Sequence, residues 1–381
     1  MISLATPEAL LERLVAIDTQ NPPGGEVEAA ELLRDLLSGI GFDAVTDEYA
    51  SGRANVIGKI DNGPGPVFAF NTHLDVVPTG GDWTRPPLRL TRDGGRLYGR
   101  GSNDAKGPLA AMVCAADRLA ADRASWSGTL LAVFVGDEEV ASEGAKHYAA
   151  GRPQVDFAVI GEPTSNHVVS AHKGSLRPLV RVRGQTAHSG TPELGVNAIF
   201  QAARLLALLE SHAAEVSRKL HPLCGSSSLT VTRALGGHAD NVVPDAFEFL
   251  IDRRLVPGES EESAKREIEG LLEEASKTQG IDAEILEWRP TTGGPTETPE
   301  DHQVVQAALA ASGDHGGDGS RTYGFQGGCD LVHFRSVGAA GIVLGPGDLA
   351  VAHKPDEFVP VSELQAAVSI YESIARRMFG S

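Results

Sequence analysis

The chain has 381 residues, enough for a large core and for two domains, because single cores rarely grow past roughly 250 to 300 residues. Its 41% hydrophobic and 22% charged residues are ordinary for a soluble globular protein and argue against wholesale disorder. The formal charge of −18 would repel phosphate backbones and anionic lipids, so nucleic acid and membranes are poor candidate partners.

The cysteines and the amino terminus indicate the compartment. Cys114, Cys224 and Cys329 are far apart and odd in number, unlike the disulfide framework of a secreted protein. The first residues have no basic start and no small-residue cleavage site, and Thr6 and Pro7 are typical of a helix cap and first helical position. No apolar run approaches the roughly 18 residues that predict a membrane span. We therefore expect a cytoplasmic protein.

The first part of the chain alternates helical and strand patterns, beginning with a helix at residues 7–17. This alternation predicts an α/β fold in which a mostly parallel sheet carries helices on both faces. The elements that follow in chain order are a strand at 67–70, a helix at 108–121, and strands at 129–135 and 155–160.

Several of these strands run directly into polar residues. The first is followed by NTHLD, the second by GDEE and the third by GEP, and the stretch GIVLGPGDLAVAH at 341–353 repeats the design. In open α/β sheets ligands gather at the carboxyl ends of strands, so we expect these endings to converge on one cleft.

Residues 174–288 show a different order of predicted strands and helices from the rest of the chain. They separate its amino-terminal part from its carboxyl-terminal part. Their pattern predicts the order β-α-β-β-α-β of a ferredoxin-like unit inserted into a larger domain made of residues 1–173 and 289–381. The glycine-rich stretch 311–328 contains Asp314, His315 and Asp318, but so many glycines favour a mobile loop over a metal site.

His73 and Asp75 open the question of chemistry. Side chains alternate along a strand, so both are expected on one side, as a ligand and its orienting carboxylate. A histidine hydrogen-bonded to a turn aspartate is the simpler alternative. Further ligand-type residues follow other strands or lie in loops, and each taken singly has a structural explanation such as a helix cap or a solvated face. They are Asp104, Glu138, Glu139, Glu162 and His353.

Taken together, these residues favour a two-metal hydrolase. Two histidines with several carboxylates exceed one tetrahedral site but suit two divalent ions about 3.5 to 4 Å apart that share a bridging carboxylate. Glu138 and Glu139 follow an apolar run, where burial is expected, and their adjacency allows one to bind metal while the other acts as general base.

The motifs HLDVVP, GRGSNDAKGPLAAM, DEE, GEP, GQTAHSG, NVVP to DRRLVP, and AHKPDEF occur in this order over nearly the whole chain. In them the chain resembles the dinuclear zinc amidohydrolases and exopeptidases that include acetylornithine deacetylase, succinyl-diaminopimelate desuccinylase, the aminoacylases and glutamate carboxypeptidases. The resemblance implies a zinc-exopeptidase-like α/β domain with an inserted ferredoxin-like lid and dimerisation domain.

The resemblance also implies roles for the candidate residues. His73 and Glu162 would bind one ion, Glu139 and His353 the other, and Asp104 would bridge them, with a cis peptide bond after it. Asp75 would accept the free ring N–H of His73. Glu138 would be the general base that passes a proton from water to the leaving amine.

For the inserted domain, the resemblance implies a homodimer and three further residues. His188 would reach the active site across the dimer and steady the oxyanion. Asn241 would help to bind the substrate or its oxyanion, and Arg254 would grip the substrate carboxylate through its two-donor fork. The neighbouring Arg253 is expected to be solvated.

The resemblance implies hydrolysis of the N-acyl bond of a small acylated amino acid, most like acetylornithine deacetylase in amino-acid metabolism and arginine biosynthesis. The metals would be zinc, with cobalt or manganese as alternatives. A desuccinylase, a general aminoacylase, and a dipeptidase or carboxypeptidase share the same chemistry, and a non-catalytic binding homologue is the alternative from another class. The chain contains no G-x-S-x-G elbow, which argues against a serine hydrolase.

Overall fold

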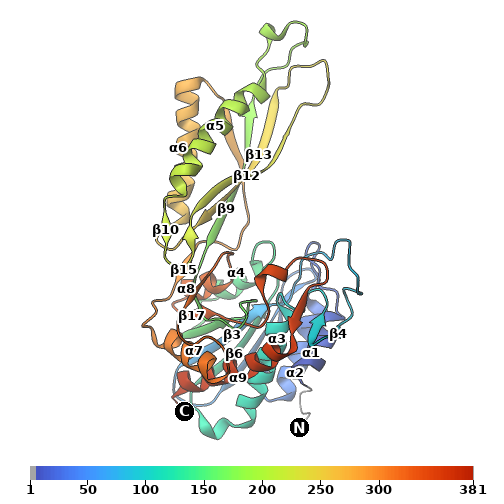
Figure 1. The fold of residues 1–381 in the computed structure, drawn as a ribbon, viewed down its shortest axis with the longest axis vertical. Coiled ribbons are helices and arrows are strands. Elements are labelled where there is room, and N and C mark those ends of the chain that lie inside the picture. The colour runs from blue at the N-terminus through green and yellow to red at the C-terminus, as the bar shows by residue number, and fades with distance from the viewer. Residues whose placement is uncertain (1–5, 381) are drawn as a thin grey trace. The chain divides into compact units, whose positions relative to one another are not determined.

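A computed structural model describes residues 6–380, which fold as two units (Figure 1). Unit 1 comprises the chain up to Ala171 together with Glu297–Phe325 and the residues from Cys329 onward. Unit 2 comprises His172–Thr296 and Gln326–Gly328. Within the described residues, no helix has both the length and the apolar character needed to span a membrane.

The central sheet of unit 1 has the strand order β1-β2-β6-β3-β7-β17-β8-β15, and β16 pairs with β8. Its middle strands, β6, β3, β7 and β17, pair in parallel, whereas β1, β2 and β8 pair antiparallel. The strands are β1 (Asp43–Ala50), β2 (Arg53–Asp61), β3 (Val67–His73), β6 (Thr129–Val135), β7 (Phe157–Ile160), β8 (Val169–His172), β15 (Thr296–Glu297), β16 (Tyr323–Phe325) and β17 (Ala340–Val343).

Alternation along the strands creates two apolar faces, each covered by helices. In β3, Phe68 and Phe70 face one cluster, which contains residues of α1, α2, α3, α7 and α9, while Ala69 faces a second cluster with residues of α4 and α8. The α/β class with helices on both faces of a mostly parallel sheet is therefore confirmed. The helices are α1 (Pro7–Val15), α2 (Val27–Gly39), α3 (Lys106–Ala121), α4 (Glu143–Ala150), α7 (Gln303–Asp314), α8 (Leu331–Ser336) and α9 (Val361–Phe379), with short 3-10 turns η1 (Arg123–Ser125) and η3 (Leu349–Val351).

The predicted start of the first helix is confirmed at atomic detail. The Thr6 side chain accepts a hydrogen bond from the N–H of Ala9, and Pro7 occupies the first helical position, where its missing N–H costs nothing. The buried Leu10, Leu11 and Leu14 then join the larger core cluster.

A small three-stranded sheet in unit 1 brings together two loops that are distant in sequence. Its order is β18-β5-β4, and Tyr98 at the end of β5 pairs with Phe358 at the start of β18. The residues after Tyr98 therefore run beside those before Phe358. The strands are β4 (Thr91–Asp93), β5 (Arg96–Tyr98) and β18 (Phe358–Pro360).

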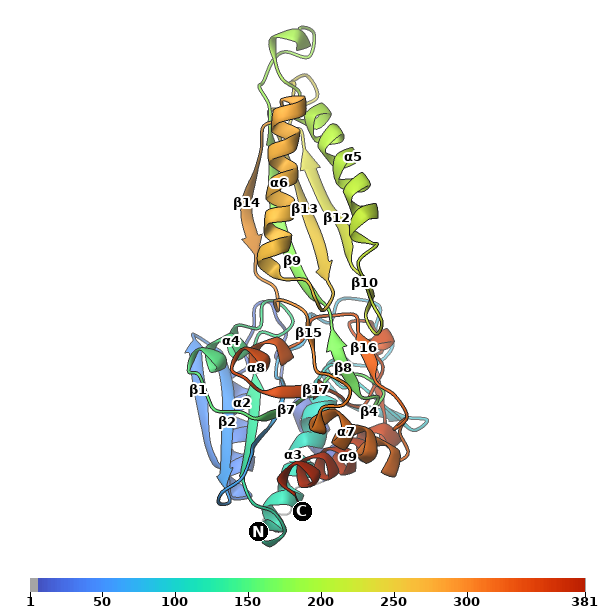
Figure 2. The same ribbon diagram turned by 90° about the vertical axis from the view of Figure 1, so that its left-hand side faces the viewer.

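Unit 2 contains an antiparallel sheet of order β12-β13-β9-β14, with both long helices on one face (Figure 2). Its chain order around this sheet is β9-α5-β12-β13-α6-β14, the predicted ferredoxin-like pattern. Side chains of α5 and α6 pack on β9 and β13 around the buried Phe249 and Ile251. The elements are β9 (Gly174–Arg183), η2 (Pro192–Leu194), α5 (Ala198–Val216), β10 (Leu220–His221), β11 (Gly225–Ser226), β12 (Ser228–Gly236), β13 (Ala246–Leu255), α6 (Glu261–Gln279) and β14 (Ala283–Arg289).

Candidate metal centre

His73 occupies the last position of β3, and its side chain is only 1% exposed. Its ring Nδ1 lies 2.9 Å from the backbone carbonyl oxygen of Asp75, which accepts a hydrogen bond from the ring N–H. The Asp75 carboxylate, the acceptor that the sequence predicted, is 3.7 Å from the same nitrogen. A proton on Nδ1 leaves the Nε2 lone pair available for a ligand.

The Asp75 carboxylate instead holds the loop that follows β6. One oxygen accepts the backbone N–H of Glu138 at 3.1 Å, and the other accepts that of Glu139 at 3.2 Å. The amide of Asn21 donates to the second oxygen at 2.8 Å. The ring N–H of His73 pairs with the backbone carbonyl of Asp75. Asp75 thus orients two consecutive glutamates rather than the histidine ring.

Asp104 places its two carboxylate oxygens toward two different histidines. Oδ1 lies 3.2 Å from Nε2 of His73, and Oδ2 lies 3.3 Å from Nε2 of His353. The peptide bond between Asp104 and Ala105 is cis, as the resemblance implied. A carboxylate that faces two imidazole nitrogens through opposite oxygens has the geometry of a ligand shared by two ions.

Glu139 lies beside His353, with Oε2 3.0 Å from the ring Nε2. Its other oxygen, Oε1, is buried and lacks a hydrogen-bond partner in the part of the chain that the structure describes. A buried carboxylate oxygen without a partner costs free energy that a bound cation would recover. The His353 side chain is 52% exposed, so this end of the cluster is open to solvent.

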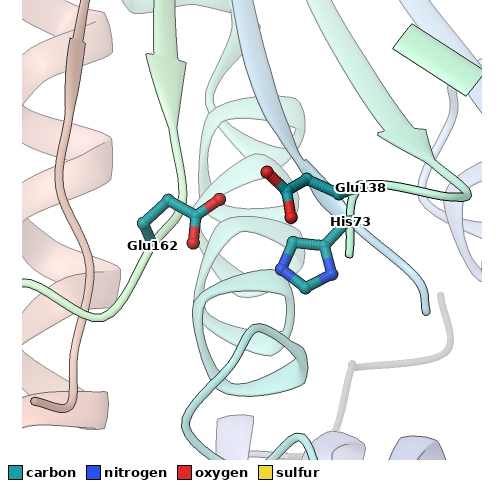
Figure 3. Close-up of side chains that lie close together, drawn as sticks. All are labelled: His73, Glu138 and Glu162. Carbon is teal, nitrogen blue, oxygen red and sulfur yellow. The ribbon is translucent and has the colours of Figure 1, made fainter. Parts of the chain in front are cut away.

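Glu138 and Glu162 complete the cluster on the other side of His73. Figure 3 shows their carboxylates turned toward one another and toward the imidazole ring. One ligand atom from each of the three side chains lies within 4.8 Å of the others, and the same holds for His73, Asp104 and Glu139. The structure thus forms two adjacent donor groups that share His73. Glu138, predicted as the base, is itself one of the three residues of the first group.

Negative charge dominates this buried cluster. Burial raises the pKa of the Glu138 carboxyl well above its usual range, and the neighbouring Glu162 carboxylate raises it further. Burial also raises the pKa of Glu162, against the lowering effect of His73. Burial would raise the pKa of Asp104 as well, but its hydrogen bonds with His353 and His73 outweigh burial and lower that pKa.

The donor set fits divalent ions. Cations among these side chains would stabilise the ionised carboxylates that burial disfavours. Imidazole nitrogens combined with carboxylate oxygens suit zinc, cobalt or manganese. By contrast, Asp314, His315 and Asp318 of the glycine-rich stretch are absent from the metal-type groups formed by the described residues. Asp314 instead ends α7 and pairs with Arg377.

The three predicted residues of unit 2 occupy exposed or half-exposed positions. His188 accepts a hydrogen bond from the N–H of Gly190 through its ring Nδ1. Its loop lies beside Asn241, whose carbonyl oxygen accepts the N–H of Ser189 at 3.0 Å. Arg254 is 29% exposed, and its fork donates to the carboxylate of Asp252, with Nε 2.6 Å from one oxygen. The structure therefore brings His188 and Asn241 together and pairs Arg254 within its own strand.

The prediction that Arg253 is solvated was wrong. Its side chain is 0% exposed and pairs with Glu259 and Glu267. Side chains alternate along β13, so Arg253 does lie on the face opposite Arg254, as expected. The helices cover that face, and there Glu267 of α6 compensates the charge of Arg253.

Sequence reasoning missed two polar networks around the cluster. In the first, Asn21 also donates to Asp137, and Arg53 pairs with both Asp137 and Glu26. In the second, the buried side chains of Arg100 and Glu357 pair with each other. The signal for the second was that both residues lie inside the motifs GRGSNDAKG and AHKPDEF. In the first, Asp137 lies in the motif DEE, whereas its partners Asn21, Glu26 and Arg53 lie outside the identified motifs.

Comparison with known proteins gives a consistent result. The model of Peptidase family M20/M25/M40 matches residues 69–377. An acetylornithine deacetylase of Myxococcus xanthus is 34% identical over 95% of this chain and 94% of its own length. A probable succinyl-diaminopimelate desuccinylase of Staphylococcus epidermidis is 29% identical over 96% of each chain.

Among solved structures, an M20 family metallo-carboxypeptidase of Sulfolobus solfataricus superposes with a TM-score of 0.80 at 19% identity, covering 99% of this chain and 100% of that one. At this identity the similarity supports the fold. It extends over both units, because nearly the whole chain is covered.

Proposed function

The chain belongs to peptidase family M20/M25/M40, a family of metallopeptidases and amidohydrolases, and from that premise we propose that it hydrolyses the N-acyl amide bond of a small acylated amino acid. The predicted family resemblance is confirmed by the family match and by the 34% identical relative. The observation that carries the proposal is the position of Asp104, whose two oxygens face His73 and His353.

In this proposal His73 and Glu162 would hold one ion, Glu139 and His353 would hold the other, and Asp104 would be shared by both. Zinc, or alternatively cobalt or manganese, would supply Lewis-acid polarisation of the amide carbonyl and a lowered pKa for water. The distances from Asp104 to both histidines and from Glu139 to His353, each between 3.0 and 3.3 Å, support this division of ligands.

Glu138 is the general base of the proposed reaction. It accepts the proton of the attacking water and returns it to the leaving amine nitrogen as the amide bond breaks. Its backbone N–H is fixed by the Asp75 carboxylate, which also fixes Glu139. Asp75 therefore fixes the backbone of the proposed base, Glu138, and that of the proposed ligand, Glu139, relative to each other.

Unit 2 is proposed to supply substrate contacts. Arg254 grips the substrate carboxylate, Asn241 binds the substrate or its oxyanion, and His188 steadies the oxyanion in the active site of a partner subunit. The exposure of His188 and Asn241 and their adjacent loops support a shared role. Because Asp252 already occupies two donors of Arg254, the substrate carboxylate competes with Asp252 or uses the remaining donors.

A homodimer formed through unit 2 is part of the proposal. β12 is an edge strand of its sheet, and an open edge can pair with a second copy of itself. Large apolar side chains are exposed on β12 itself and on α5, with Leu235 at 71% and Phe200 at 72%. An apolar groove between α5 and β12, lined by Leu206 and Val231 among others, continues this surface.

A panel of substrates tests the function. Release of free amine is measured from N-acetyl, N-succinyl and N-formyl amino acids and from dipeptides, with chelated protein before and after adding zinc, cobalt or manganese. Metal-dependent turnover of the N-acetyl class is expected, and turnover of acetylornithine would assign the protein to arginine biosynthesis. The desuccinylase relative makes the N-succinyl class the second candidate. Failure of every substrate while two ions bind per chain would contradict the proposed substrate class.

We also propose a cytoplasmic location. The three cysteines are buried as thiols, and burial raises the pKa of Cys114 to about 12, which keeps that thiol protonated. A reducing compartment suits this state. Fractionation of cells that express the protein checks this, and recovery from an extracellular fraction would contradict it.

A further inference from the structure

Arg100 and Glu357 form a buried ion pair between two loops of unit 1, and each side chain is 1% exposed. The pairing of Tyr98 with Phe358 in the small sheet brings these loops together. The N–H of Gly99 donates to the carbonyl of Glu357 at 3.0 Å, which continues the same register. Neither side chain belongs to the proposed ligand set. Each nevertheless comes from a segment that contains a proposed ligand, Asp104 or His353.

The Glu357 carboxylate is used on both of its oxygens. Oε1 accepts the backbone N–H groups of Asn103 and Asp104, both at 3.0 Å. Oε2 accepts from Nη1 of Arg100. The backbone amide of the proposed bridging ligand is therefore held by a carboxylate that Arg100 in turn orients.

Arg100 extends the contact to further loops. Nη1 donates to the carbonyl of Lys354 at 3.4 Å, next to His353 in sequence, and Nη2 donates to the carbonyls of Pro78 at 3.3 Å and Thr79 at 3.4 Å. The guanidinium also lies over the ring of Trp83, 5.1 Å from its centroid. The pair thus joins the segment after β3, the Asp104 loop and the His353 loop.

We propose that Glu357, oriented by Arg100, is a positioning residue for both metal sites, because it sets the backbone of Asp104 relative to His353. This rests on the proposed two-metal function. A buried ion pair is weak evidence for stability by itself, since desolvation offsets much of its attraction. The pair is expected to act on metal binding by orienting the ligands. Partners that orient metal ligands typically contribute about 10- to 100-fold in metal affinity.

The test is the variant Glu357→Gln. Glutamine keeps the shape of the side chain but has only one acceptor oxygen, so it satisfies either the two backbone amides or Arg100 and presents N–H donors to the other. Zinc dissociation constants for both binding steps are measured on the folded protein by competition with a chelator. We expect both steps to weaken by about 10- to 100-fold, with the far-UV circular dichroism spectrum unchanged.

A matched control comes from unit 2, where the buried Arg253 pairs with Glu259, whose side chain is 12% exposed. Glu259→Gln is expected to lower thermal stability and to leave both zinc constants within twofold of the wild type. If Glu259→Gln weakens zinc as much as Glu357→Gln does, the effect is general destabilisation and the inference fails.

A second variant, Arg100→Lys, keeps a positive charge opposite Glu357 and covers the case in which Glu357→Gln does not fold. It loses most of the donors that reach the three loops and is expected to weaken both zinc steps about tenfold. Unchanged zinc dissociation constants in the folded variants, or weaker zinc binding at only one of the two steps, would overturn the inference. In either case the proposed function would stand as long as the wild-type protein binds zinc. A wild-type protein that binds no zinc, cobalt or manganese overturns both.

Discussion

At the residue scale, the cluster separates two tasks that adjacent glutamates perform. Glu139 directs an oxygen at His353, whereas Glu138 lies on the side of His73 and Glu162. Both backbone amides are held by the same Asp75 carboxylate. The two side chains thus occupy fixed and different places although they are consecutive in sequence.

The first prediction concerns Glu138. Glu138→Gln removes the proton acceptor while keeping the side-chain volume, so kcat is expected to fall by about 10²- to 10⁴-fold. Two ions per chain should remain bound, as measured by elemental analysis after dialysis. Glu143→Gln, on exposed residue 143 of the same segment, is the matched control and should retain activity. A Glu138→Gln protein that loses an ion along with its activity would make Glu138 a ligand instead.

The second prediction concerns Asn21, whose amide joins Asp75 to Asp137. Asn21→Ala leaves both buried carboxylates short of a donor and loosens the loop that carries Glu138. We expect kcat to fall about 10- to 100-fold, in the range for groups that orient active-site residues. Steady-state kinetics check this, and Gln20→Ala, one residue earlier, serves as the control. Equal losses in the two variants would contradict a specific role for Asn21.

At the element scale, parallel pairing explains why the ligands meet. His73 is paired with Val135, the last residue of β6, and Asn71 is paired with Ile160, the last residue of β7. Residues that follow these strands therefore emerge at one edge of the sheet, where Glu138, Glu139 and Glu162 lie. The sequence predicted this because apolar runs ended in polar residues. Alternation and burial are local properties that a sequence records.

Other contacts could not be predicted because they depend on partners far away in the chain. Arg100 and Glu357 are 257 residues apart, and only the register of the small sheet joins them. Likewise, the period of β13 placed Arg253 opposite Arg254, but the sequence did not show that α6 would cover that face with Glu267. The sequence predicted that the Asp75 carboxylate accepts from His73, because the two residues are close in sequence. It did not show that the backbone N–H groups of residues 138 and 139 would reach the same carboxylate.

The third prediction concerns pH and the charged cluster of unit 2. Burial alone would raise the pKa of Glu267, but its pairs with Lys219, His212 and Arg253 outweigh burial and lower the pKa from 4.5 to about 2. An acid whose pKa is lowered by folding stabilises the fold above its unfolded pKa. That contribution is therefore lost as the pH falls from about 4.5 to about 2.

Chemical denaturation of the full chain at a series of pH values checks this, with Glu267→Gln for comparison. The variant should be less stable at neutral pH, and its unfolding free energy should decrease less than that of the wild type over this window. Parallel pH curves for the two proteins would show that Glu267 does not contribute. Glu269→Gln, on the same helix outside the network, is the control.

At the scale of the whole molecule, the predicted α/β class and the ferredoxin-like order both appear in the structure, and the family match covers residues 69–377. Long apolar segments with clear periods made these features predictable. Substrate choice has no comparable signal, because one methylene in an acyl pocket changes binding by only about 1 to 3 kcal/mol.

The fourth prediction concerns the proposed dimer. Phe200→Glu introduces a charge into the exposed apolar surface of unit 2 and should convert a dimer into monomers by analytical ultracentrifugation. The monomer should lose activity if His188 acts across the interface, while metal content stays unchanged. Lys277→Glu, on the exposed end of α6, is the control and should remain dimeric. A wild-type protein that sediments as a monomer would contradict the dimer directly.

The division of unit 1 by unit 2 has a consequence for biosynthesis. Unit 2 is almost entirely one continuous stretch, whereas unit 1 needs segments from both sides of it. Chains are made from the amino terminus, and domains generally fold as units during synthesis. A ribosome-bound chain that has just passed unit 2 already carries His73, Asp104, Glu139 and Glu162, but not His353. Because unit 1 also needs the segments after unit 2, which carry Glu357 as well, both proposed metal positions are completed only after translation of the carboxyl-terminal segment.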